Sequence, residues 1–284
     1  MTSTIHDLGY RRYDGERLST RSAWNALFVQ GIRTLFGFGR PARAKALPVF
    51  VLVFSSMPAV ISVFIASETG IPIRHSAYFA GVSILYVLFA AAQTPELFSR
   101  DQANRVLPLV FSRDLSRWQY ASARLLSVML ALFVMMIVPQ LVLWLGGIGM
   151  AEDTVATFKD RWPVIGPILA VSTLGGVMLG AIASAISFVT LRRHLATAAI
   201  VGLFIVLGAA TTALGSTSVI EPKTSQLFNP IMVLEVANRL LFDEPTRIAT
   251  RAIGNPLSVY IGMIALYSAL SLTIVWWRSQ KVDA

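Results

Sequence analysis

The chain has 284 residues, of which 55% are hydrophobic and 14% are charged, and this excludes an ordinary soluble domain, in which about 25% of residues are charged. The formal charge of +9 comes from basic residues spread over several segments, which favours orientation against an anionic membrane leaflet over nucleic-acid binding. There is no cysteine, which excludes disulfides, thiol catalysis and iron–sulfur ligation.

Residues 1–45 form a polar segment that ends in a predicted amphipathic helix over residues 20–40. One stripe at helical spacing carries only apolar side chains, while Gln30 and Arg33 lie opposite. The stripe consists of Trp24, Leu27, Phe28, Ile32, Leu35 and Phe36. Aromatic residues on one face beside basic residues suit a headgroup boundary, so we expect an interfacial helix along the inner leaflet. The alternative is a helix packed on the bundle with no further role.

Six long apolar stretches without a charge occupy most of residues 46–278. They are 47–66, 76–92, 125–147, 164–190, 195–214 and 257–277. Because a bilayer core of about 30 Å needs roughly 20 helical residues, these stretches predict transmembrane helices rather than barrel strands. We therefore expect an all-α membrane protein with six transmembrane helices.

The lysines and arginines are concentrated in every second segment outside the apolar stretches. Most of the 24 lie in residues 1–46, in 93–124, at the turn 192–193 and after residue 277. The positive-inside bias then places both termini, including the tail 279–284, on the cytoplasmic side of the cytoplasmic membrane.

The cytoplasmic segment 93–124 is too long for a simple connection between neighbouring helices. Pro95 suits the start of a short helix, Pro108 is expected to end it, and residues 112–116 are expected to turn into the third span. A short helix beneath the membrane suits the docking of a cytoplasmic protein. The alternative is a solvated loop whose arginines only enforce topology.

The outer loop 215–256 contains a predicted helix over residues 228–242 that begins near Pro230. Glu235, Asn238 and Arg239 would share one polar face of this helix. Whether it lies on the surface or re-enters the bundle stays open at this point, as does a role at a substrate exit.

The fourth span carries a small residue at every fourth position, namely Ser172, Gly176, Gly180 and Ser184. Such a stripe permits close helix approach, and we favour packing within the chain over a dimer seam. Because no charged residue lies deep within a span, an apolar or amphipathic substrate is expected. Candidate contacts along its pathway are Tyr86, Phe89, Met135, Met136 and Gln140.

The sequence predicts no catalytic or metal site of its own. The three histidines, His6, His75 and His194, fall in three separate places and form no metal-ligand pattern. Three acidic residues, Glu152, Asp153 and Asp160, cluster in one outer loop without a recognisable spacing. The alternative that the chain is a membrane enzyme depends on them. No phosphate-binding Gly-x-x-x-x-Gly-Lys-Ser/Thr motif occurs.

Two stretches resemble ABC-2 type transporter permeases. The first resembles the segment that follows their second helix. It begins with Pro95-Glu-Leu-Phe-Ser-Arg-Asp101 and continues with Val106-Leu-Pro-Leu109, Ser112-Arg-Asp-Leu-Ser-Arg117, Tyr120 and Ala123-Arg-Leu-Leu126. The opening Ile5-His-Asp-Leu-Gly-Tyr-Arg-Arg-Tyr-Asp-Gly15 is similar to the N-termini of actinobacterial members. The order of the six spans, the interfacial helix and the helical outer loop also fits that family.

The resemblance implies a half-transporter. It would pair with a second permease chain, identical or related, and sit on two ATP-binding subunits that bind ATP and magnesium, while this chain binds no cofactor. A coupling helix would dock on the ATPase through Glu96, Phe98, Arg100 and Asp101, bordered by Arg113, Asp114 and Arg117, with a second contact at Arg192 and Arg193. The cargo would be a drug, an antibiotic or a lipid-like compound. An ion-coupled carrier and a non-transporting scaffold are the alternatives.

Overall fold

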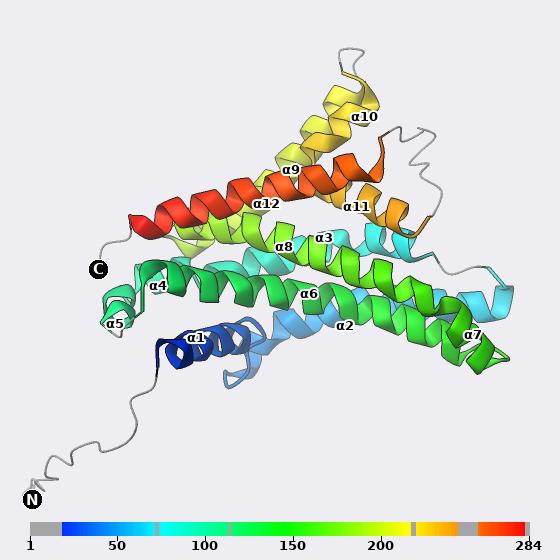
Figure 1. Ribbon diagram of the computed structural model, residues 1–284, viewed down its shortest axis with the longest axis horizontal. Helices are drawn as coiled ribbons and strands as arrows, with labels where there is room; N and C mark the ends of the chain where they lie inside the picture. Colours follow the sequence, from blue (N-terminus) through cyan, green and yellow to red (C-terminus); the bar gives the residue numbers. More distant parts are fainter. Residues whose placement is uncertain (1–18, 72–73, 113–114, 217–219, 244–254, 282–284) are drawn as a thin grey trace, which may run out of the picture.

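The computed structural model describes residues 19–71, 74–112, 115–216, 220–243 and 255–281, and every regular element within these ranges is a helix (Figure 1). Among these described residues, six helices are long and apolar enough to cross a membrane, which confirms the predicted spans. They are α2 (Ala42–Thr69), α3 (His75–Gln93), α6 (Arg117–Gly149), α8 (Ile165–Val189), α9 (Arg193–Ser216) and α12 (Leu257–Gln280).

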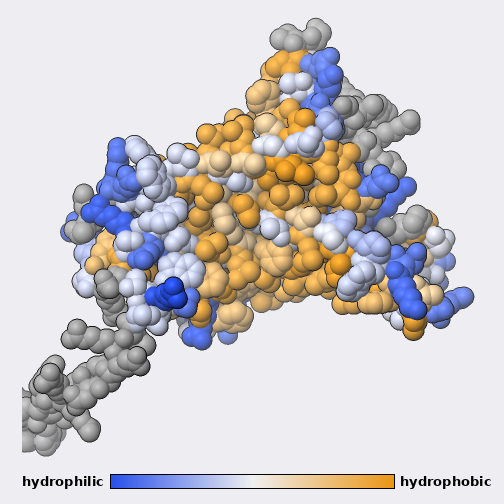
Figure 2. All heavy atoms as spheres, viewed as in Figure 1, coloured by the Kyte–Doolittle hydropathy of each residue, from blue (hydrophilic) through white to orange (hydrophobic). Residues whose placement is uncertain are grey.

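Helices α3, α6 and α8 form the inside of the bundle, and α2, α9 and α12 lie at its periphery. The apolar window of the span containing α8 is 72% buried, whereas that of α2 or α9 is 22% buried. In Figure 1 α9 slopes away from the other long helices and carries α10 (Pro222–Ser225) at its far end. Figure 2 shows an apolar belt across the middle and hydrophilic residues at the two ends. This distribution is the one expected for a helical bundle in a bilayer.

Small residues bring α8 against α6. A Cβ atom at Gly176 would lie 2.9 Å from the carbonyl oxygen of Met129 and 3.0 Å from the amide nitrogen of Phe133. Ser172 and Ser184 of the same stripe are fully buried. At Gly176 the two helix backbones therefore approach so closely that even a methyl group would force them apart. This contact lies within one chain.

Helix α11 (Pro230–Leu241) packs into the bundle instead of lying on its surface. Its N-cap residue Asn229 accepts a hydrogen bond from the amide of Ile231 at 3.0 Å, and Pro230 follows in the first turn. The helix contacts α3, α8 and α12, and Val233, Leu234 and four neighbours on it are buried. At the same end of the bundle α7 (Thr154–Arg161) and the 3₁₀ turn η2 (Trp162–Val164) connect α6 to α8.

At the opposite end, residues 94–112 fold into an elbow between α3 and α6. It consists of η1 (Thr94–Glu96), α4 (Ser99–Ala103) and α5 (Leu107–Phe111). The prediction that Pro108 ends a helix is wrong, because Pro108 stands in the first turn of α5, where a missing amide hydrogen costs no hydrogen bond. Ser116 then caps α6 through a capping box with Gln119. Helix α1 (Thr20–Leu35) lies beside this end of α6.

Candidate functional site

Three arginines at the elbow end meet at Glu96, which is only 8% exposed. Its carboxylate accepts hydrogen bonds from Arg40 at 3.4 Å and from Arg100 at 3.0 Å, and it forms an ion pair with Arg193. Arg40 precedes α2, Arg100 lies on α4 and Arg193 begins α9. One carboxylate therefore connects three segments that are far apart in the sequence.

A second ion pair joins the elbow to α6. Arg124 donates from Nη2 to Asp101 at 2.8 Å, and the hydroxyl of Tyr120 donates to the same carboxylate oxygen at 2.9 Å. The Arg124 guanidinium also lies over the Tyr120 ring, 5.7 Å from its centroid. Arg124 is 4% exposed, and among the described residues its Nε and Nη1 atoms have no hydrogen-bond partner. A buried cation is thus held by a single carboxylate.

The elbow is also bound to the last turn of α8. Phe98 is fully buried, with its ring centroid 5.2 Å from that of Phe188. Ser99 donates to the carbonyl oxygen of Ser187 at 2.8 Å, and Gln102 donates to that of Phe188 at 3.0 Å. These bonds satisfy carbonyl groups at the helix end, which have no partner within the helix. The elbow is therefore anchored to the end of α8.

The tip of the elbow, residues 103–109, is mostly exposed, although Leu107 within it is buried. Asn104, Arg105 and Pro108 are exposed, and Leu109 is 70% exposed. Arg105 adopts a positive φ of 52° between α4 and α5. A macromolecule approaching this end would meet the tip before the buried ion pairs.

The structure divides the predicted coupling residues into two groups. Glu96, Phe98 and Asp101 face inward, and the exposed or half-exposed ones are Arg100, Arg117, Arg192 and Arg193. Arg117 donates to the carbonyl oxygen of Gln280 at the end of α12 at 2.7 Å. Arg113 and Asp114 lie outside the described residues.

Sequence reasoning did not assign Arg40 and Arg124 to this site. For Arg124 a signal was available, since it is the last charge before a long apolar run. No sequence pattern indicated a role for Arg40, because it lies 56 positions before Glu96 in the sequence.

The residues predicted to line a substrate pathway are packed in the interior. Tyr86, Phe89, Met135, Met136 and Gln140 are each at most 1% exposed. Gln140 bonds to the ring of His75 at 2.7 Å, and the Met136 side chain lies against Gly175. In the described conformation these side chains form the core between α3, α6 and α8.

The opposite end of the bundle holds separate polar groups. Glu235 and Arg239 of α11 form an ion pair of 3.0 Å, and the fully buried Asn238 between them makes no side-chain hydrogen bond within the described part of the chain. Asp153 caps α7 by accepting from the amide of Ala156 at 2.9 Å. No group of three or more His, Asp or Glu side chains in the described ranges could hold a metal ion.

No family model matches the chain, and no curated protein has significant sequence similarity to it. The functional assignment therefore depends on the geometry of the elbow end and on the sequence patterns.

Proposed function

We propose that this chain is the membrane-spanning permease subunit of an ATP-driven exporter of the ABC-2 type. The observation that supports this most directly is the elbow, a folded segment with an exposed tip that is anchored to the surrounding helices. With both termini cytoplasmic, as the basic residues predict, the tip would face the cytoplasm. There it would dock on an ATP-binding subunit.

The anchoring contacts explain how a push on the tip would reach the membrane helices. Through Glu96 the elbow contacts the segments before α2 and at the start of α9, through Asp101 it contacts α6, and through Phe98 it contacts α8. A displacement of the elbow would therefore move several helices together, as in rigid-body rearrangements of packed elements. ATP and magnesium would be bound by the partner, because the sequence has no phosphate-binding loop.

The proposed cargo is an apolar or amphipathic compound such as a drug, an antibiotic or a lipid-like molecule. The core side chains available to contact it are aromatic, thioether and amide groups, as at Phe89, Met135 and Gln140. Since these are packed in the described conformation, a pathway would form only when helices separate, or against a second permease chain.

The rival functions fit less well. Ion-coupled carriers normally keep ionisable groups at mid-membrane depth, whereas the ion pairs described above lie at the elbow end or on α11. A scaffold would not need an elbow anchored to several helices. For a membrane enzyme, the acidic residues Glu152, Asp153 and Asp160 would have to converge, and Asp153 is engaged as a helix cap.

The test is affinity purification of this chain from its native membrane, which should co-purify an ATP-binding protein, followed by reconstitution with that protein. The wild-type chain should form a stable complex and change the ATPase rate of that protein. Arg105→Glu at the tip should weaken the complex about tenfold, since a charge reversal that faces the partner would lower the binding free energy by about 1.4 kcal/mol. Lys159→Glu on α7, an exposed charge reversal at the opposite end, is the matched control. A wild-type chain without effect on the ATPase, or equal binding by both variants, would refute the proposal.

A further inference from the structure

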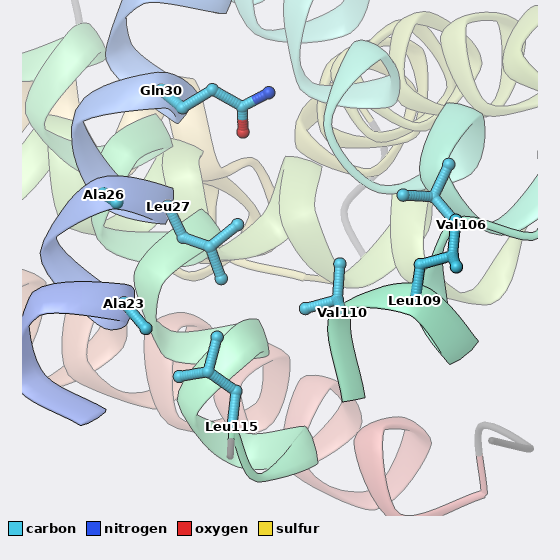
Figure 3. A pocket seen from close by; sticks show the side chains of 8 residues that line it. All are labelled: Ala23, Ala26, Leu27, Gln30, Val106, Leu109, Val110 and Leu115. Atoms are coloured by element: carbon cyan, nitrogen blue, oxygen red, sulfur yellow. The ribbon is translucent and has the colours of Figure 1, made fainter. Parts of the chain in front are cut away.

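An apolar groove separates α1 from the elbow. It has a volume of about 430 Å³ and is lined by Ala23, Ala26, Leu27, Gln30, Val106, Leu109, Val110 and Leu115. Figure 3 shows the side chains of α1 facing those of the elbow across this space. Seven of the eight lining residues are apolar, so the groove suits a hydrocarbon chain better than it suits water.

A polar groove of about 300 Å³ adjoins the apolar one, and Leu27, Gln30, Val106 and Val110 line both. Its charged lining residues are Arg40, Glu96, Arg100, Asp101 and Arg124. The two grooves together offer an apolar chamber next to a charged one, which matches an amphipathic ligand.

The charges around the polar groove are unequal. Glu96 pairs with Arg40, Arg100 and Arg193, and Asp101 pairs with Arg124, so four guanidinium groups share two carboxylates. The buried Arg124 retains two nitrogen atoms without an acceptor among the described residues. Buried donors are rarely left without a partner, because desolvation without a hydrogen bond is costly. Arg124 therefore has donors available for an additional acceptor, and the excess of guanidinium groups over carboxylates favours an anionic one.

We propose that the joined grooves bind one anionic phospholipid, with its phosphate in the polar groove beside Arg124 and Arg100 and an acyl chain in the apolar groove. Basic pockets between membrane helices on the cytoplasmic side are known to bind anionic headgroups. A soluble anion would leave the apolar groove unfilled, and a zwitterionic lipid such as phosphatidylcholine would bring its own cation beside the arginines. The lipid would join α1 to the elbow. Its binding requires no ATP-binding partner, so the inference is independent of the proposed function.

The test uses the full-length protein in a neutral detergent and measures bound lipid by native mass spectrometry and thermal unfolding. Wild-type protein should retain one phosphatidylglycerol in preference to phosphatidylcholine, and added phosphatidylglycerol should raise its unfolding temperature. Arg124→Gln should weaken retention about fivefold, the effect typical of one basic residue near an anionic lipid. Ala26→Trp, which fills the apolar groove from an exposed position on α1, should weaken it without altering a charge.

Matched controls are Arg105→Gln and Val29→Trp, both at exposed positions outside the two grooves. They should bind like the wild type. Equal retention of phosphatidylcholine would overturn the anionic part of the proposal, and an equal temperature shift with inorganic phosphate would identify a site for a free anion. If Arg124→Gln does not fold, lipid retention by Arg100→Gln and Ala26→Trp tests the proposal instead. Retention of phosphatidylglycerol at the wild-type level in both variants would refute the lipid site.

Discussion

Replacing Glu96 by glutamine tests the contact that connects the most segments of the elbow end. The substitution keeps the shape of the side chain and removes its charge. Three guanidinium groups would then surround a neutral amide that can offer only one oxygen acceptor. Arg40, Arg100 and Arg193 would repel each other or turn toward water, and the segments before α2 and at the start of α9 would separate from the elbow.

The expected loss of unfolding free energy in Glu96→Gln lies between the loss for an exposed ion pair and the loss for a buried ion pair. The Glu96 side chain is 9% exposed, while its partners Arg40, Arg100 and Arg193 are 29%, 46% and 53% exposed. Exposed pairs contribute about 0.2–1 kcal/mol each, and breaking a fully buried pair costs about 3–5 kcal/mol. Because two of the three arginines can rehydrate, we expect a loss of about 2 kcal/mol. For a chain of this size that corresponds to a fall of about 5 °C in unfolding temperature.

The assay is thermal unfolding of the detergent-solubilised protein. The fraction that remains folded after heating is measured by size-exclusion chromatography. Glu152→Gln, an exposed acid at the opposite end, is the control and should unfold with the wild type. Under the proposed function, the complex of Glu96→Gln with the ATP-binding subunit should hydrolyse ATP with reduced transport, since the buried carboxylate would position the elbow. If Glu96→Gln unfolds at the same temperature as Glu152→Gln, the reasoning about this cluster is wrong.

Three further substitutions address other contacts. Asp101→Asn should cost about 3–5 kcal/mol in lipid-free detergent, since it removes the carboxylate that pairs with the buried Arg124, and thermal unfolding measures this loss. Gly176→Ala should destabilise the α6–α8 contact by about 1–3 kcal/mol, whereas Gly202→Ala, whose Cβ would meet no atom within 4 Å, should unfold with the wild type. Ser116→Ala should cost about 1 kcal/mol by removing the α6 cap, and a fall of about 2–3 °C in unfolding temperature would show it.

The six spans could be predicted from the sequence because length and composition alone decide whether a helix can cross lipid. The same holds for α11, where Asn229 and Pro230 provide a local start signal. The break within the elbow could not be predicted in this way. Pro108 is compatible with the end of one helix or the first turn of the next, and its neighbours do not distinguish the two.

Within the site, the sequence identified the elbow but not which of its side chains face inward. Glu96 and Asp101 lie in a polar stretch and could equally face solvent. They are buried because Arg193 and Arg124 come from helices that fold against them. Such partners depend on tertiary contacts, which helical periodicity does not contain. The exposure of Leu109 follows from the same arrangement, since α5 projects beyond the ends of the spans (Figure 1).

The central claim is that the elbow faces the cytoplasm, and the absence of cysteine allows a direct test. Asn104→Cys at the tip and Glu152→Cys at the opposite end each introduce the only thiol, both at exposed positions. A membrane-impermeant maleimide added to intact cells should label Glu152→Cys, and it should label Asn104→Cys only after the membrane is opened. Labelling of Asn104→Cys in intact cells, with Glu152→Cys protected, would contradict the account.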